Sequence, residues 1–396
     1  MIIKNITVLG EDKQFREGYI KIRDGMFEAI IFDTYDKHDC EPNSGNFYLQ
    51  EEIIDGQGCY AIPGLIDLHF HGAVGADLSD GTIDAIERIA AYEASVGVTS
   101  ICPASMTLPE SDLQKTMIAA KIFMESQRAC IDSKSRLAGI NLEGPFISEK
   151  KKGAQSADHI KPCDLKLFKR LQNASSNLIK LVSVAPETEN AMEFIREVKD
   201  DVTVSLAHTT ADYEIASKAF KCGARHVTHL YNAMPGFLHR DPGVIGAAYD
   251  CPDCCVELIC DGVHIHPAVV RSTFQMFSQE RVVMISDSMR ATGLKDGCYS
   301  LGGQEVFVHG NLAKLADGTI AGSVTNLMEC VRTAVQKMGI PLGTAVACAS
   351  MNPAKVLGIY ESVGSISPGK YADLVLLDRN LKVKAVYLGG VPVPRY

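Results

Sequence analysis

Short apolar runs rich in β-branched residues alternate with amphipathic stretches from residue 62 to about residue 340. Continuous apolar runs of this length are typical of strands buried on both faces, and amphipathic stretches are typical of helices that cover a sheet. The pattern predicts eight strands: Ile62–His69, Gly97–Cys102, Arg136–Glu143, Lys180–Ala185, Val202–His208, Ala224–Leu230, Val256–Asp261 and Val282–Asp287.

Helical periodicity fills most of the gaps between these strands. Only the segment after the sixth strand reads as a long loop. Strands that alternate with helices form parallel sheets, and eight such units in series predict an α/β fold, a TIM-like (β/α)8 barrel, over residues 62–362. The expected helices cover 83–95, 111–128, 164–173, 188–200, 211–222 and 267–279, with 323–338 after the eighth strand.

The two ends of the chain show strand-like patterns without helices between them. A polar stretch near the N-terminus, Thr34–Asn46, is expected to be a loop. Neither end has enough strands for a stable sheet of its own, so we predict a composite small β-sandwich domain of residues 1–61 and 363–396. Its expected strands are Ile2–Leu9, Tyr19–Arg23, Ala29–Phe32, Leu374–Leu377 and Val383–Leu388.

Composition and charge narrow the class of protein. The 396 residues are 46% hydrophobic and 22% charged, as in ordinary globular proteins. A formal net charge of -9 without any basic run argues against a nucleic-acid partner, although a small anionic substrate stays open. No apolar stretch approaches the roughly 18 residues of a membrane span, and the first residues lack the apolar core of a signal peptide. We expect no membrane partner and a cytoplasmic location.

The 13 cysteines are odd in number and irregular in spacing, which favours reduced thiols over a disulfide framework. Cys251, Cys254 and Cys255 include a Cys-x-x-Cys element of the kind that begins a structural zinc site, but no second ligand pair follows at finger spacing. A loop followed by a strand that contains Cys260 is the favoured interpretation.

Two histidines, His69 and His71, stand two positions apart at the end of the first apolar run. Side chains two apart in a strand point the same way, so this pair is suited to bind one metal ion. Core histidines without a ligand role occur about as often in such a pattern. The pair alone therefore does not decide between a metal site and a packed core.

The ends of the other predicted strands change that balance. In (β/α)8 barrels the chemistry lies at the C-terminal ends of the strands. Imidazole and carboxylate groups together suit zinc, iron or another first-row divalent ion. Six side chains that can bind such an ion stand at five predicted strand ends: His69, His71, Glu143, His208, His229 and Asp287.

Several motifs together resemble a known family. The chain is similar to the N-acetylglucosamine-6-phosphate deacetylases of the amidohydrolase superfamily across essentially its whole length. The segment Gly364–Asp373 is a more general mark of the superfamily. The motifs that carry the resemblance are Pro63–Gly72, Leu142–Phe146, Lys151–Ala154, Ala185–Glu187, Thr228–Met234, Arg240–Gly243, Asp261–His264 and Ala321–Ser323.

The resemblance implies a metal-dependent enzyme that hydrolyses N-acetylglucosamine 6-phosphate to glucosamine 6-phosphate and acetate, with one or two divalent ions, zinc or iron. In this family Glu143 would replace the carboxylated lysine that other amidohydrolases carry on strand four, and here strand four ends without a lysine. One ion would be held by Glu143, His208 and His229. A second would be held by His69, His71 and Asp287, with Glu143 as the bridge.

Roles in catalysis and recognition follow from the same resemblance. Asp287 would act as general base toward water and then as general acid toward the departing amine, and His264 would polarise the acetyl carbonyl. A buried residue without a catalytic role is the alternative for His264. Asn232, Ala233 and Arg240 would bind the phosphate, with Arg240 contributed across the interface of a homodimer. The alternative is a surface ion pair between Arg240 and Asp241.

The sugar pocket would be lined by the backbone of Ala321, Gly322 and Ser323. Gln155 stands where relatives often have a histidine that contacts the sugar, and Asn141 also stands where many have histidine.

These departures leave N-acetylgalactosamine 6-phosphate open as the substrate. A cyclic-amide hydrolase of the dihydroorotase type would require the strand-four lysine, and a non-enzymatic scaffold is expected to have lost ligands that are all present here.

Overall fold

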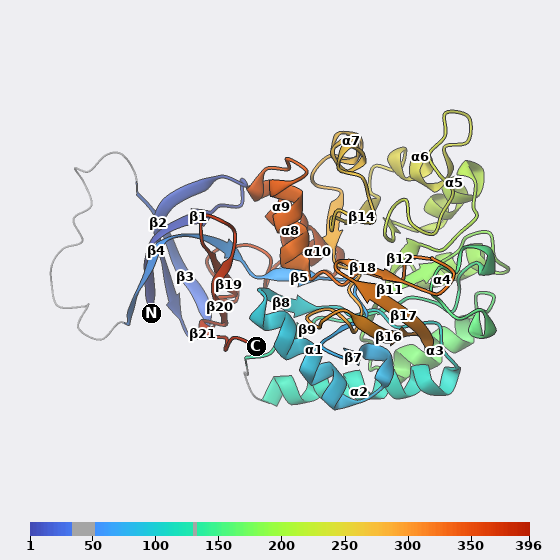
Figure 1. Cartoon of the computed structure of the whole chain (residues 1–396), viewed down its shortest axis with the longest axis horizontal. Coiled ribbons are helices and arrows are strands. Elements are labelled where there is room, and N and C mark those ends of the chain that lie inside the picture. The colour runs from blue at the N-terminus through green and yellow to red at the C-terminus, as the bar shows by residue number, and fades with distance from the viewer. Residues whose placement is uncertain (34–51, 130–132) are drawn as a thin grey trace.

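The computed structural model describes residues 1–33, 52–129 and 133–396. Figure 1 shows a sheet formed by both ends of the chain on one side and a larger α/β part on the other. The polar stretch Thr34–Asn46, predicted as a loop, lies outside the described residues.

Both ends of the chain contribute to one seven-stranded sheet, which confirms the predicted pairing of the termini. Its strand order is β21-β20-β19-β4-β1-β2-β3, because β4 pairs in parallel with β1 and antiparallel with β19. A single sheet is seen, so its description as a sandwich stays a prediction. The strands are β1 (Ile2–Leu9), β2 (Phe15–Arg23), β3 (Met26–Phe32), β4 (Ile53–Pro63), β19 (Leu374–Leu377), β20 (Val383–Leu388) and β21 (Val391–Pro392).

The larger part is built on two parallel sheets. One has six strands in chain order, β10 (Ile140–Leu142), β11 (Ile179–Val184), β12 (Thr203–Leu206), β13 (His226–Val227), β14 (Cys255–Ile259) and β15 (Val282–Ile285). The other has three, β5 (Leu65–Asp67), β8 (Val98–Ile101) and β9 (Arg136–Leu137). Nearly all of their residues are buried, as the continuous apolar runs predicted.

Backbone hydrogen bonds connect these two sheets at both edges. The Asn141 N–H donates to the Pro103 carbonyl at 3.0 Å, next to β10. At the opposite edge the Asp287 N–H donates to the His69 carbonyl at 3.0 Å. The segments that directly follow β5, β10 and β15 are thereby brought to one face of the molecule.

The helices confirm the predicted alternation, with slightly different bounds. The segment after the sixth strand was expected to be a loop, and this expectation is wrong because it contains α6 (Gly243–Tyr249). Six of the seven residues of α6 are buried, so its sequence has no polar face to give a helical period. The other helices are α1 (Ile83–Ser95), α2 (Glu110–Ala129), α3 (Leu165–Ala174), α4 (Ala191–Val198), α5 (Tyr213–Cys222), α7 (Pro267–Phe277), α8 (Leu327–Gln336), α9 (Leu342–Cys348) and α10 (Met351–Val356).

The first predicted strand, Ile62–His69, is also corrected. Its start belongs to β4 of the terminal sheet, and β5 begins only after Gly64. A Cβ atom at Gly64 would lie 2.1 Å from Thr99 Oγ1, so the chain passes here only without a side chain. One apolar run thus serves two sheets.

A hairpin insert precedes α8. It forms a three-stranded antiparallel sheet of β16 (Gly297–Leu301), β17 (Gln304–His309) and β18 (Leu312–Lys314). Short elements complete the fold: β6 (Gly72–Ala73), β7 (Ala76–Asp77), η1 (Leu78–Asp80), η2 (Glu149–Lys151) and η3 (Ala157–His159).

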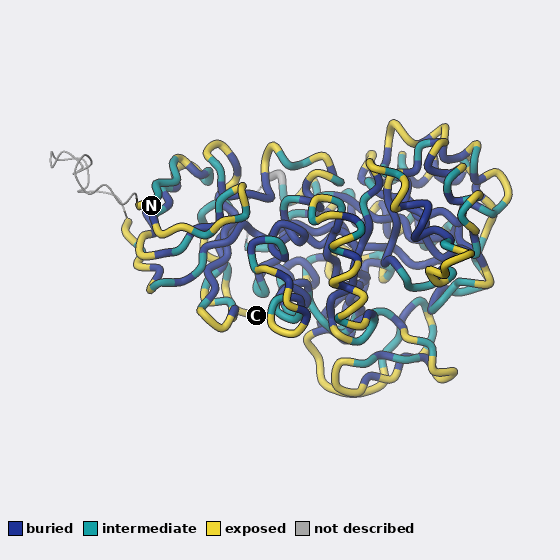
Figure 2. Tube along the Cα trace, turned by 90° about the horizontal axis from the view of Figure 1, so that it is seen from above, coloured by how far each residue is buried: buried dark blue, intermediate teal, exposed yellow. Residues whose placement is uncertain are grey.

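Burial is continuous through the middle of the larger part, and exposed residues gather on the outer turns (Figure 2). All the described cysteines are free thiols. Cys255 begins β14 and Cys254 directly precedes it, as a loop followed by a strand requires, but Cys260 lies just beyond the last residue of this strand, Ile259. Among the helices of the described residues, none has the length and hydropathy that a membrane crossing requires.

Candidate metal centre and active site

The six predicted metal-binding side chains converge from five strand ends. Each stands within a few residues beyond its strand rather than in it, because the chain turns sharply there. Three of them have a backbone in the left-handed region, with φ of 43° at His208, 29° at His229 and 50° at Asp287. Such a conformation is uncommon for residues other than glycine and is frequent at functional sites.

Glu143 forms one group with two of the histidines. Its Oε1 atom lies 3.2 Å from His208 Nε2 and 3.2 Å from His229 Nε2. The two Nε2 atoms are only 3.1 Å apart. All three side chains are buried, and their potential ligand atoms lie within 4.8 Å of one another, close enough to bind one metal ion.

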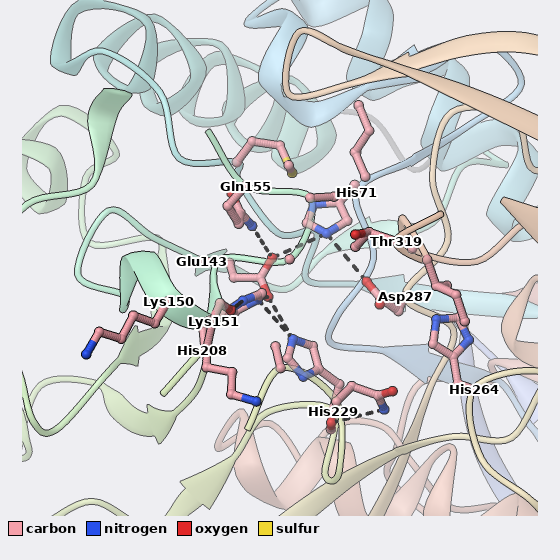
Figure 3. Close-up of a pocket in the computed structure, with 18 residues that line it drawn as sticks. His71, Glu143, Lys150, Lys151, Gln155, His208, His229, His264, Asp287 and Thr319 are labelled. Atoms are coloured by element: carbon pink, nitrogen blue, oxygen red, sulfur yellow. Dashed lines mark hydrogen bonds and ion pairs between the residues drawn. The ribbon is translucent and has the colours of Figure 1, made fainter. Parts of the chain in front are cut away.

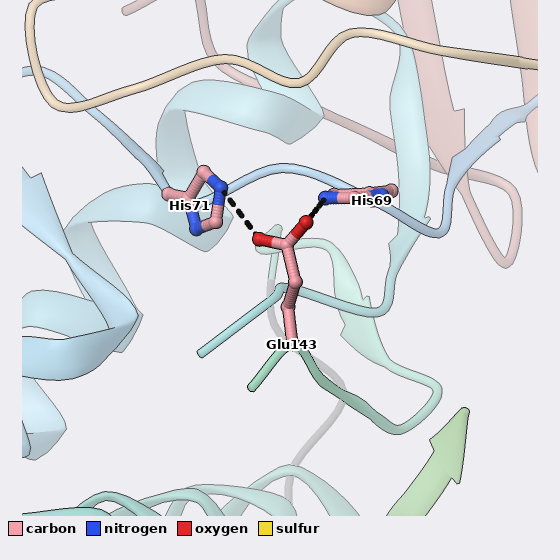
Figure 4. Close-up of side chains that lie close together, drawn as sticks. All are labelled: His69, His71 and Glu143. Carbon is pink, nitrogen blue, oxygen red and sulfur yellow. Dashed lines mark ion pairs between the residues drawn. The ribbon is translucent and has the colours of Figure 1, made fainter. Parts of the chain in front are cut away.

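His69 and His71, which follow β5, form a second group with the same carboxylate (Figure 4). His69 Nε2 lies 3.3 Å from Glu143 Oε1, and His71 Nε2 lies 3.3 Å from Glu143 Oε2. Asp287 Oδ1 approaches the same two rings, at 3.4 Å from His71 Nε2 and 3.7 Å from His69 Nε2. Glu143 therefore stands between the two groups, as the resemblance implied.

The charges of this centre depend on one another. Burial by itself would raise the pKa of Glu143, yet the charge of His69 and the hydrogen bonds from His208 and His229 hold that pKa well below its usual value. Burial also opposes the charged form of His69, but Glu257 and Glu143 raise the pKa of its ring well above the usual value. The centre thus favours an ionised Glu143 beside a positively charged His69.

One loop supports this group from behind. The His208 Nδ1–H donates to the Lys151 carbonyl at 2.8 Å, since a carbonyl can only accept, and the Nε2 atom of the same ring faces Glu143. Gln155 donates from its amide to Glu143 Oε2 at 2.9 Å and accepts from the Thr107 N–H at 2.7 Å. The amide of Gln155 is therefore engaged by the protein at both ends.

His264 is held by the aspartate that ends its own motif. Its Nδ1 lies 2.8 Å from Asp261 Oδ2, and its backbone N–H donates to Asp261 Oδ1 at 3.0 Å. Burial opposes the charged ring, but the hydrogen bond and charge of Asp261 raise the pKa of His264 above its usual value. The free Nε2 of this ring can act as a hydrogen-bond donor to a substrate.

A cavity of about 380 Å³ opens over the centre, and Figure 3 shows many of its side chains. Two cations to which the sequence analysis gave no role, Lys150 and Lys151, also line it. The predicted residues that line the cavity are His71, Glu143, Gln155, His208, His229, Asn232, Ala233, His264, Asp287 and Gly322. Further lining comes from Met106, Gly153, Ala154, Leu301, Thr319 and Ile320.

Three predicted substrate contacts lie outside this lining. Arg240 is exposed on the loop before α6, and the described ion pairs do not include one between Arg240 and Asp241. Ala321 and Ser323 are buried beside the cavity, where the Ser323 N–H donates to the Asp287 carbonyl at 2.7 Å. Their roles toward a substrate stay predictions.

Glu257 is a buried acid at the centre that the sequence analysis also missed. Its Oε2 atom accepts from His69 Nδ1 at 2.8 Å and from the His229 N–H at 2.9 Å. A charged residue inside the apolar run of β14 was the available signal.

Comparison with known proteins decides the family. Residues 60–393 match the model of the amidohydrolase family. The chain belongs to the amidohydrolase family. This amidohydrolase is a hydrolase that acts on an amide bond, and its family is metal-dependent.

Two curated relatives match this amidohydrolase over nearly all of its length. The N-acetylglucosamine-6-phosphate deacetylase of Bacillus subtilis is 37% identical over 97% of this chain and 94% of its own length. The N-acetylgalactosamine-6-phosphate deacetylase of Escherichia coli O157:H7 is 35% identical over 98% of both.

Solved structures agree with this placement. The N-acetyl-D-glucosamine-6-phosphate deacetylase of Mycobacterium smegmatis, solved as a variant in complex with N-acetyl-D-glucosamine-6-phosphate, is 30% identical. It matches with a TM-score of 0.89 over 99% of both chains. The N-acetylglucosamine-6-phosphate deacetylase of Thermotoga maritima is 29% identical and matches with a TM-score of 0.86 over the whole of both chains.

Proposed function

We propose that this amidohydrolase removes the acetyl group from N-acetylglucosamine 6-phosphate, with glucosamine 6-phosphate and acetate as products. The observation that carries the proposal is the convergence of four histidines on one buried carboxylate, Glu143, with Asp287 beside two of them, at an open cavity. The names of the relatives supply the substrate class.

The residues at the centre fit a divalent ion. His208 Nε2 and His229 Nε2 face each other at 3.1 Å and both face the same carboxylate oxygen. Three donor atoms so placed are better satisfied by a shared cation than by protons alone. Glu143, His208 and His229 would hold one ion, and His69, His71 and Asp287 would hold a second, either of them zinc or iron.

Divalent cations supply Lewis-acid chemistry and bring the pKa of water to about 7. The carboxylate of Asp287, at the floor of the cavity, would receive the proton of the attacking water and pass it to the amine that departs. The ring of His264, held by Asp261 through Nδ1, would polarise the acetyl oxygen from its Nε2 side as negative charge develops there. Acetate and the free amino sugar are then released.

Phosphate recognition is proposed at the cationic side of the cavity. Asn232 and Ala233 line it beside Lys150 and Lys151, which offer positive charge to a phosphate. The exposed Arg240 would complete the site from the second subunit of a homodimer.

The proposed homodimer is supported by apolar exposure next to Arg240. Phe237 is 50% exposed and Leu238 is 58% exposed on the same loop, an arrangement that favours coverage by another subunit.

Replacement of Arg240 by alanine is expected to raise KM for the phosphorylated sugar by about 10- to 100-fold, because a hydrogen bond to a charged group is lost. KM for unphosphorylated N-acetylglucosamine should stay within about twofold, since that sugar makes no such bond. Steady-state kinetics on both sugars measure this, with Lys337→Ala as a control that removes an exposed cation at the end of α8. Equal effects on both substrates would place the phosphate elsewhere.

Metal removal should abolish activity. Protein purified without chelators is expected to contain between one and two first-row ions per chain, and dialysis against a chelator should stop acetate release. Elemental analysis beside the activity assay checks this, with readdition of zinc or iron to the same sample as the control. Full activity in metal-free protein would reject the proposed mechanism.

N-acetylgalactosamine 6-phosphate is the second candidate substrate, because a relative named for that sugar covers 98% of this chain at 35% identity. Acetate release from the 6-phosphates of N-acetylglucosamine, N-acetylgalactosamine and N-acetylmannosamine, measured side by side, tests the choice. The highest kcat/KM on the first sugar is expected.

A cyclic-amide activity is disfavoured, because β11, the fourth strand of the predicted barrel, is followed by Ala185 and Pro186 and not by a lysine.

The proposal includes the architecture that presents the site. The two parallel sheets would be arcs of one (β/α)8 barrel over residues 62–362, and the backbone hydrogen bonds at both of their edges support this closure. Residues 1–61 and 363–396 would form the composite β-sandwich domain beside it. A cytoplasmic location likewise stays a prediction.

A further inference from the structure

Glu257 is a fully buried carboxylate inside the parallel sheet, in the middle of β14. A buried carboxylate is costly unless it is paired and hydrogen-bonded. Its described ion pairs are both with imidazoles, His69 at 2.8 Å and His226 at 3.7 Å. The partners of this charge are therefore found at the metal centre and directly below it.

The contact with His69 determines which ring nitrogen faces the centre. A carboxylate can only accept, so His69 Nδ1 carries the proton that it donates to Glu257 Oε2. The other nitrogen, Nε2, is then the one directed at Glu143 Oε1 and Asp287 Oδ1. Metal binding uses the lone pair of this nitrogen and displaces any proton on it, and a carboxylate behind the ring also increases its basicity.

The contact with His229 is different in kind. Glu257 Oε2 accepts from the backbone N–H of His229 at 2.9 Å and does not touch its ring. This bond fixes the backbone of His229, whose φ is 29°, but it does not determine which nitrogen of the His229 ring carries the proton. One carboxylate thus contacts both metal-binding groups, and it changes the electron density of a ligand in only one of them.

The other ligand histidines have weaker support. His208 Nδ1 donates to a neutral carbonyl, that of Lys151. Within the described residues, His71 Nδ1 and His229 Nδ1 have no hydrogen-bond partner. His69 is accordingly the ligand on which a charged partner acts.

We propose that Glu257 is a positioning residue that fixes the tautomer of His69 and selectively strengthens the metal site of His69 and His71. The inference rests on the proposed two-ion centre. Its effect is expected at that site, because the site of Glu143, His208 and His229 is reached only through a backbone contact.

The test compares Glu257→Gln with wild type by titrating metal-free protein with zinc against a chromophoric chelator. The Kd of the site of His69 and His71, identified as the one that is missing in His71→Ala, is expected to rise by about 10- to 100-fold, as for loss of other partners behind a ligand. The Kd of the other site should stay within about threefold. Glu93→Gln is the matched control, since Glu93 is equally buried, lies on α1 and has no hydrogen bond to a metal-binding residue within the described part of the chain.

A second variant separates loss of the charge from loss of the fold. Glu257→Asp keeps the negative charge but places it one methylene farther from His69, so an intermediate rise in the Kd of the site of His69 and His71 is expected. In a His69→Ala background, Glu257→Gln should have no further effect on zinc affinity, because the ring through which it acts is gone.

Each outcome separates the inference from the proposed function. Wild-type protein that takes up one zinc ion in total would overturn the two-ion centre together with this inference. Two ions in wild type, with unchanged or equally weakened sites in Glu257→Gln, would overturn the inference alone. A larger loss in Glu257→Asp than in Glu257→Gln would show that charge is not the cause.

Discussion

Replacement of Asp287 by asparagine is expected to lower kcat by about 10³-fold or more, with the fold intact. A positioned proton-transfer group contributes about 10²- to 10⁴-fold, and Asp287 is proposed to act both as base and as acid. Asparagine has the same shape but accepts no proton at neutral pH. Burial opposes ionisation of Asp287, yet the hydrogen bond from His71 and the charges of His69 and His71 lower its pKa, so wild type carries the carboxylate that the role requires.

The measurement is kcat on N-acetylglucosamine 6-phosphate, with metal content determined on the same sample. Asp296→Asn, in the exposed part of the hairpin insert, is the matched control and should retain wild-type turnover. Turnover near wild type in Asp287→Asn would reject the proton-transfer role. A loss of one metal ion together with activity would instead assign Asp287 to metal binding alone.

The positions of the strands were predictable because burial on both faces leaves a continuous apolar signal. Their ends were not. The predicted strands Val202–His208 and Val282–Asp287 extend past β12 and β15, because His208 and Asp287 have left-handed backbone conformations that residue type does not reveal. The ligands were nevertheless found, since a histidine or acid after an apolar run is conspicuous wherever the strand stops.

The surroundings of the ligands were harder to predict. Lys150 and Lys151 stand in the short charged segment Glu149–Lys152, which in sequence resembles a solvated surface, and only the tertiary fold places them at the cavity. Gln155 was expected to contact the sugar, but its amide reaches Glu143 and the Thr107 backbone. Asn141, which stands where many relatives have histidine, donates from its amide to the Leu68 carbonyl at 3.5 Å.

Replacement of Glu143 by glutamine should have the other large effect, a loss of both bound metal and activity. In wild type its carboxylate lies within 3.3 Å of the Nε2 atoms of four histidines. A neutral amide would turn a donor N–H toward rings that also present nitrogen, and it would remove the negative charge at which the side chains of both groups meet. The loss should exceed the roughly 100-fold that removal of a partner behind a ligand costs.

The matched comparison is His71→Ala, which removes one ring from one group and leaves Glu143, His208 and His229 in place. This variant is expected to keep one zinc ion per chain, whereas Glu143→Gln should keep none. Elemental analysis of both proteins after gel filtration provides the measurement. Retention of one ion by Glu143→Gln would mean that the histidines hold metal without the bridge. The two groups would then be independent sites rather than halves of one centre.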